Sequence, residues 1–273
     1  MRIRTTLATV LAGLTLACAA AAAHAEAREE AQLLTASQIL EELRTSRDQA
    51  IPDRLLARAY GIAVIPDVTK IAWFLGGRRG HGVLIVRDKD GRFTSPVFVT
   101  LTGGSFGFQW GIQSTDVVLV FTTPKGIEGI NGGKVTLGGD ASVAAGPVGR
   151  QASAATDATF KAEVYSYSRN RGAFVGLALD GSVISIDDRA DADFYGKPAV
   201  TAADIMSGGV RSNDEATRRF LAAVSVSTEG QQRQASAAPT NPPAASRAAG
   251  AAPAPSSAQT FPLSDPKPGS EPK

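Results

Sequence analysis

Glycine is concentrated in the middle of this 273-residue chain, where 20 of the 28 glycines lie between Gly76 and Gly181. Inside a strand, each glycine costs about 0.5 to 1 kcal/mol relative to alanine. Strands that keep many glycines are typically those that bend sharply, bulge or lie close to another backbone. The glycine pattern therefore predicts a small sheet that is strongly curved or closed.

Short runs of branched and aromatic residues predict the strands of this sheet. The first of these runs cover residues 71–75, 82–87, 93–101, 106–112 and 117–122. Turn signals separate them at residues 76–77, 88–91, 103–104 and 114–116. Because no helix-length pattern intervenes, we expect antiparallel pairing. Later strands are expected at residues 135–137, 160–168, 173–179 and 182–186.

Helical patterns lie on both sides of the β region. Between residues 26 and 60, apolar residues that include Leu33 and Leu40 recur at the three- and four-residue spacing of an amphipathic helix. Further helices are expected at residues 124–130, 190–195, 202–206 and 213–226. The predicted fold class is therefore α+β: a strongly curved, barrel-like antiparallel sheet with N-terminal helices and a C-terminal helix packed on it.

The first 25 residues have the composition of an export signal, with an apolar stretch that ends in the cleavage site Ala23-His24-Ala25. Cleavage there removes 2 of the 28 basic residues, so that 26 basic residues face 26 acidic ones. A domain with such balanced charge is not typical of a nucleic-acid binder. We expect an exported protein, periplasmic or extracellular. The alternative is a lipoprotein anchored through Cys18, which ends the partial lipobox Thr15-Leu16-Ala17-Cys18.

The C-terminal end of the chain differs in composition from the domain before it. Nine of the 15 prolines lie between Pro239 and Pro272, among alanine and serine residues. Such a segment buries too little apolar surface to offset the entropy of ordering it. The predicted organisation is a signal peptide at residues 1–25, one domain at residues 26–228, and a disordered tail at residues 229–273.

Motifs for catalysis and metal binding are weak. Gly103 to Gly107 fits the pattern G-x-S-x-G, but the residues after Ser105 alternate like a strand where a nucleophile elbow requires a helix. The histidine after the predicted cleavage site, His81, precedes Ser105, and no cysteine follows that site. We therefore expect no enzymatic activity and no cofactor. A weak candidate calcium site comprises Asp187, Asp188, Asp191 and Asp193, but it lacks the EF-hand spacing, and capping of the next helix explains several of these carboxylates more simply.

Basic and aromatic residues gather in the first predicted strands, where Lys70, Trp73, Arg78 and Arg79 are close in sequence. Cations beside amphipathic rings suit an anionic phospholipid headgroup. Each cation near the membrane surface contributes roughly 1 kcal/mol to the free energy of binding. The alternative interpretation is an ordinary solvated hairpin whose aromatic residues belong to the core.

Several ordered runs of the chain resemble the SYLF domain family, which is also named for a yeast actin-binding protein. These runs lie at residues 59–66, 80–84, 91–96, 103–111, 116–120, 138–150, 165–172 and 194–196. The resemblance covers about Leu33 to Phe220, and because the chain also has a bacterial-type export signal, we expect it to be a bacterial, exported member. It implies a non-enzymatic lipid-binding domain. Eukaryotic relatives recognise phosphoinositides, and fungal relatives engage actin filaments.

An exported bacterial protein meets no actin, so the resemblance implies a phospholipid or another anionic amphiphile at a membrane surface as the ligand. We assign Lys70, Arg78, Arg79 and Arg171 as headgroup contacts. The predicted acyl or interfacial contacts are Leu33, Leu40 and Trp73. Eukaryotic relatives use an N-terminal amphipathic helix at the membrane. The acidic residues that flank the matching helix here favour packing on the sheet instead.

Two functions remain open at this point. In the first, the domain is a phospholipid-binding module of the bacterial cell envelope. In the second, it is an envelope scaffold that binds a protein or wall polymer through its sheet and tail, with the protein partner unknown.

Overall fold

The computed structural model describes residues 26–43, 51–72, 75–106, 111–147, 161–170 and 173–229. The predicted export signal, Cys18, Trp73, Arg171 and nearly all of the predicted tail lie outside these residues. No helix among the described residues is long and apolar enough to cross a bilayer.

Among the described residues, nine strands form one sheet, in the order β5-β9-β3-β2-β1-β4-β7-β6, with β8 paired to β7. Their bounds are β1 Gly61–Ala72, β2 Leu75–Val86, β3 Val97–Phe106, β4 Gly111–Phe121, β5 Lys134–Thr136, β6 Val143–Ala145, β7 Val164–Asn170, β8 Ala173–Gly176 and β9 Val183–Ile186. The strands pair antiparallel except β6 with β7. The predicted antiparallel sheet is thus confirmed for the long strands. It is wrong for β6, because the long connection through residues 146–163 allows a parallel return.

Helices precede the first strand and follow the last strand in the sequence, and a further helix, α3, lies between β4 and β5. Residues 26–43 are helical. The other helices are α2 Asp53–Ala57, α3 Lys125–Asn131, α5 Asp188–Tyr195, α6 Ala202–Met206 and α7 Glu215–Glu229. The predicted α+β class, with a strongly curved sheet, N-terminal helices and a C-terminal helix packed on it, is confirmed.

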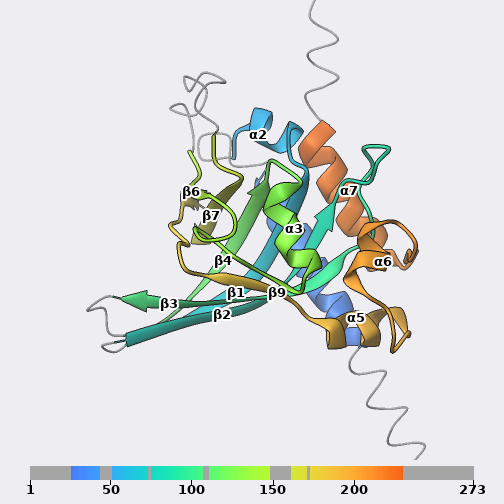
Figure 1. The fold of residues 1–273 in the computed structure, drawn as a ribbon, viewed down its shortest axis with the longest axis horizontal. Helices are drawn as coiled ribbons and strands as arrows, with labels where there is room; N and C mark the ends of the chain where they lie inside the picture. The colour runs from blue at the N-terminus through green and yellow to red at the C-terminus, as the bar shows by residue number, and fades with distance from the viewer. Residues whose placement is uncertain are drawn as a thin grey trace, which may run out of the picture. The chain divides into compact units, whose positions relative to one another are not determined.

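The sheet has a hydrophobic core on each face. The face that we call the α7 face packs Phe98 and Tyr167 against residues 26–43, α2 and α7. The opposite face, the α3 face, packs Leu101 and Leu119 against α3 and α6. Figure 1 shows α3 in front of the strands and the N-terminal helix behind them. The central strands are therefore buried on both sides along half of their length.

The curvature of the sheet has a local cause in β1. The pairing of β1 with β4 shifts register between Ile65 and Val68, and the residue between Pro66 and Val68, Asp67, has a positive φ of 49°. Proline lacks the N–H that a regular ladder needs, so it suits a bulge. The backbone N–H of Asp67 donates to Asp116 Oδ1 at 3.0 Å, which holds the bulge on β4. A bulge of this kind bends its strand and increases the local twist.

Gly82 on β2 faces this bulge at very short range. A Cβ placed at Gly82 would lie 2.4 Å from the carbonyl oxygen of Val64 and 2.7 Å from Ile65 Cα. No side chain fits there, so the glycine permits the close approach of the two backbones. The prediction that glycines mark close backbone contacts is confirmed at this position.

An ion pair joins the N-terminal helix to the sheet. Arg169 on β7 donates from Nε to Asp116 Oδ2 on β4 at 2.8 Å, and its Nη1 contacts the carboxylate of Glu42 on the helix. Leu33 and Leu40 on the same helix are fully buried in the core. The helix therefore packs on the sheet, as the acidic residues around it predicted.

Candidate functional site

The central strands extend past their outer neighbours at one end of the sheet. β9 pairs with β3 only through Val99–Thr102, and β7 pairs with β4 only through Asp116–Phe121. We call the remaining parts of the four strands the sheet extension, which consists of residues 69–72, 75–79, 103–106 and 111–115. Figure 1 shows β2 and β3 reaching to the left, away from α5, α6 and α7. Its position makes the extension accessible to a ligand.

Lys70 and Arg78 come together on the α3 face of this extension. They are direct cross-strand partners in the β1–β2 ladder, so their side chains lie on the same face. Both line a pocket of about 270 Å³. The rest of its wall is formed by apolar or neutral residues: Val68, Gln113, Thr115, Val117, Ser168, Val175 and Leu177. We call this the cationic pocket.

The charges of the cationic pocket have no acidic partner among the described residues, since neither Lys70 nor Arg78 takes part in any of the ion pairs found there. Two like charges opposite each other destabilise a sheet. Burial lowers the pKa of the Arg78 guanidinium, because the surroundings disfavour its charged form. An anion bound in the pocket would therefore reduce the repulsion between the two cations and stabilise the charged form of Arg78.

The hydrogen bonding of Arg78 is incomplete. Its Nη1 donates to the carbonyl oxygen of Ala178 at 3.4 Å, while its buried Nε has no partner in the described structure. The buried hydroxyl of Ser182 also has no partner there. Both groups lie against Gly103, where an added Cβ would be 2.5 Å from Ser182 Oγ and 3.3 Å from Arg78 Cγ. Unpaired buried polar groups typically cost about 1 to 3 kcal/mol each, which is characteristic of sites kept for binding.

An apolar side chain is exposed beside these cations. Val175 on β8 lines the pocket and is 49% exposed, whereas Ile71 on β1, which is 59% exposed, follows Lys70 in the strand and lies on the opposite face. A large apolar residue at this level of exposure, next to unpaired cations, forms an amphipathic surface. Its two components match the headgroup and the acyl region of an anionic lipid.

The structure separates the predicted headgroup contacts. Arg78 and Arg79 are adjacent in a strand, so their side chains lie on opposite faces. Arg78 joins Lys70 in the cationic pocket, whereas Arg79 lies on the α7 face beside the N-terminal helix. Arg171 and Trp73 are outside the described residues. The predicted acyl contacts Leu33 and Leu40 are fully buried in the core, where they contact protein.

The predicted acidic cluster has a structural role at the start of α5. Asp187 is the N-cap, and its Oδ1 accepts the Ala190 N–H at 3.2 Å, which confirms the capping alternative. Asp191 is fully buried and accepts the Phe98 N–H at 2.9 Å, while Asp193 pairs with Arg189 at 3.8 Å. Within the described ranges, no group of three or more histidine, cysteine, aspartate or glutamate side chains could hold a metal ion. The weak calcium candidate therefore finds no support here.

Ser105 lies within β3, which continues to Phe106. Residues 103–106 of the G-x-S-x-G run are consequently in a strand, as the alternating pattern predicted, while Gly107 lies outside the described residues. A nucleophile elbow places its serine between a strand and a helix. The geometry around Ser105 does not match that arrangement.

Sequence reasoning did not anticipate a second cluster, which comprises Arg28, Gln32, Arg79 and His81 at the junction of the N-terminal helix with β2. Its members are spaced four apart on a helix and two apart on a strand, which are the spacings that place residues on one face. Only the contact between the two elements shows that the faces meet. The sequence carries no signal for that contact.

Comparison with known proteins gives the domain a family. The family model described as "Ysc84: Las17-binding protein actin regulator" matches residues 102–227. LAS seventeen-binding protein 3 of Saccharomyces cerevisiae is 39% identical over 167 residues, which cover 60% of this chain and 36% of the relative. SH3 domain-containing YSC84-like protein 1 of Xenopus laevis is 31% identical over 196 residues, covering 71% and 58% of the two chains. The human protein of the same name is 32% identical over 166 residues, covering 60% and 48%.

These relatives are longer than the shared segment, since this chain spans between 36% and 58% of their length. The matched family model runs from within β3 to α7. The resemblance to the SYLF family that the sequence runs predicted is thereby confirmed. The domain of this chain belongs to the Ysc84 (SYLF) family.

Proposed function

We propose that the domain is a non-enzymatic module that binds anionic phospholipid at the sheet extension, in the cell envelope of a bacterium. Lys70 and Arg78 contact the headgroup in the cationic pocket, and the exposed Val175, which lines the same pocket, contacts the interfacial region. The observation that carries this proposal is the pair of opposed cations that has no acidic partner among the described residues.

Electrostatics set the expected behaviour of this surface. Each well-placed cation contributes roughly 1 kcal/mol to binding an anionic membrane. Exposed charges are screened by salt, with a Debye length of about 8 Å at physiological ionic strength. Binding by the extension is therefore expected to require anionic lipid and to weaken as salt is raised.

The test is co-sedimentation of the full chain with vesicles of phosphatidylcholine alone or mixed with phosphatidylglycerol, at low and physiological salt. The variant that carries Lys70→Ala and Arg78→Ala is expected to bind anionic vesicles about 30-fold more weakly, because it lacks two headgroup contacts. The matched control carries Lys197→Ala and Arg218→Ala, which remove the same charge from exposed positions elsewhere. Equal loss in both variants would show that net charge, rather than the pocket, governs binding.

Protein binding is a second candidate function. The names of the relatives refer to Las17 binding and to actin regulation. Those names describe whole proteins, of which this chain spans only part. Co-sedimentation with filamentous actin separates the candidates. The lipid proposal predicts no pelleting with actin, and pelleting with actin but not with anionic vesicles would favour the second candidate.

A further inference from the structure

A groove of about 510 Å³ lies on the α7 face, between the N-terminal helix and the bend of β1 and β2. Its lining includes Arg28, Gln32, Asp67, Thr69, Arg79 and His81. The groove is on the opposite face of the sheet from the cationic pocket. It is large enough for a small organic ligand.

Basic side chains reach this groove from two walls. Arg28 belongs to the N-terminal helix, whereas Arg79 and His81 belong to β2. Both arginines are exposed, and neither forms an ion pair within the described part of the chain. The acid in the lining, Asp67, already accepts the Ser114 hydroxyl at 3.1 Å. The groove thus presents two unpaired guanidinium groups to a ligand.

His81 is oriented by contacts behind the groove. Its Nδ1 lies 3.2 Å from Thr100 Oγ1 and 3.4 Å from Asp187 Oδ2. A carboxylate at this distance favours a proton on Nδ1, which leaves Nε2 for a partner in the groove.

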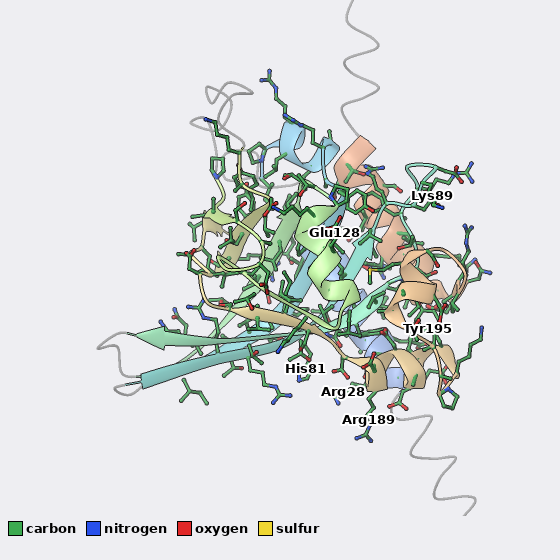
Figure 2. The ribbon with its side chains drawn as sticks, viewed as in Figure 1. Arg28, His81, Lys89, Glu128, Arg189 and Tyr195 are labelled. Carbon is green, nitrogen blue, oxygen red and sulfur yellow. The ribbon has the colours of Figure 1, made fainter. Side chains whose placement is uncertain are left out.

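Besides Asp67 in the groove itself, the acidic residues of this region lie at one end. An adjoining pocket of about 230 Å³ shares Arg28, Gln32 and His81 with the groove and adds Arg189. Glu29, Asp187 and Asp193 line that pocket but not the groove. Figure 2 shows Arg28, His81 and Arg189 close together near α5. An anion is therefore best placed at the other end of the groove, toward Arg79.

We propose that this groove binds the phosphate group of a small soluble ligand, which bridges the N-terminal helix to β2. Guanidinium groups bind the oxygens of phosphate in a bidentate geometry, and arginines on two walls suit a tetrahedral anion. The amide of Gln32 is available to neutral groups of the ligand, and the Thr69 hydroxyl, which donates to the Asp67 carbonyl oxygen at 3.3 Å, can accept a hydrogen bond from them. Because the ligand contacts both elements, its binding holds the helix on the sheet.

The experiment measures binding of inorganic phosphate and of glycerol 3-phosphate to the full chain by calorimetry, with acetate at matched ionic strength as the control anion. Saturable binding of either phosphate probe is expected, and at least a tenfold loss of affinity in the variants Arg28→Ala and Arg79→Ala. The control variant, with Lys197→Ala and Arg218→Ala, is expected to bind as the parent does. Hydrogen exchange of residues 26–43 is expected to slow when glycerol 3-phosphate is bound.

Three results would overturn this proposal. The first is an absence of saturable phosphate binding, and the second is binding that neither arginine variant weakens. The third is displacement of the chain from phosphatidylglycerol vesicles by glycerol 3-phosphate, which would make the groove the lipid headgroup site. Vesicle binding without phosphate binding would reject this inference while leaving the proposed function intact.

Discussion

Asp191 is the fully buried acid of the described structure, and its environment is unfavourable for a charge. Its Oδ1 accepts the Phe98 N–H, but its Oδ2 has no partner within the described ranges. Burial raises the pKa of Asp191 to about 7, with smaller contributions from Asp188, Asp187 and Glu29. Burial also raises the pKa of Glu29 on the N-terminal helix. In both groups, folding therefore shifts the equilibrium toward the protonated form.

This shift predicts how stability depends on pH. Between the ordinary pKa of 3.8 and the folded value of about 7, the folded state binds a proton that the unfolded state has lost. The contribution of Asp191 is therefore fully present below that window and is lost as the pH rises through it. Each unit of pKa difference corresponds to about 1.4 kcal/mol.

The variant Asp191→Asn keeps the acceptor for Phe98 and cannot become charged. We expect its thermal midpoint to exceed that of the parent at pH 8, and the difference to shrink or reverse at pH 5. Thermal unfolding at the two pH values measures this effect. Asp90→Asn, an exposed change that is not among the charges acting on Asp191, is the control. An equal effect of pH on the parent and Asp191→Asn would contradict the account.

At the residue scale, the sequence predicted which side chains carry charge but not which of them share a face. Arg78 and Arg79 were assigned to one headgroup site, although strand alternation places them on opposite faces. The partner of Arg78 is Lys70, and that pairing depends on the register of β1 with β2. A bulge sets this register, and single-sequence patterns do not reveal bulges.

At the element scale, glycine-rich segments were mistaken for turns. Gly76 and Gly77 lie within β2, Gly103 and Gly104 lie within β3, and residues 114–116 lie within β4. Similarly, β1 begins at Gly61, well before the predicted start at residue 71. Residues 62–65 are buried on both faces, so they lack the alternation that marks a strand. The helices near residues 125, 188, 202 and 215 were predicted correctly because caps and breakers mark them.

The close approach of β1 and β2 predicts the effect of a small substitution. Gly82→Ala places a methyl group within contact of Val64 and Ile65, so it is expected to destabilise the fold by about 1 to 3 kcal/mol. Gly77→Ala lies in the same strand with no atom within 4 Å of the added Cβ. That control is expected to be neutral or to stabilise the strand slightly. Urea unfolding compares the two variants, and similar stabilities would contradict the described packing.

At the scale of the domain, the two faces of the sheet have different roles. The α7 face is covered by the N-terminal helix, whose Leu33 and Leu40 are buried. The α3 face leaves its cationic pocket open at the sheet extension. The family resemblance and the α+β class followed from the sequence because ordered runs of residues persist across the domain. The location of the sheet extension could not be predicted from the sequence, since it depends on where β7 and β9 stop pairing with their neighbours.

The most direct test of the central claim is hydrogen exchange of the full chain with and without phosphatidylglycerol vesicles. The account predicts slower exchange in the sheet extension, at residues 69–72, 75–79, 103–106 and 111–115, and little change at residues 26–43. Protection confined to residues 26–43, with none in the extension, would contradict it and would place the membrane contact on the N-terminal helix.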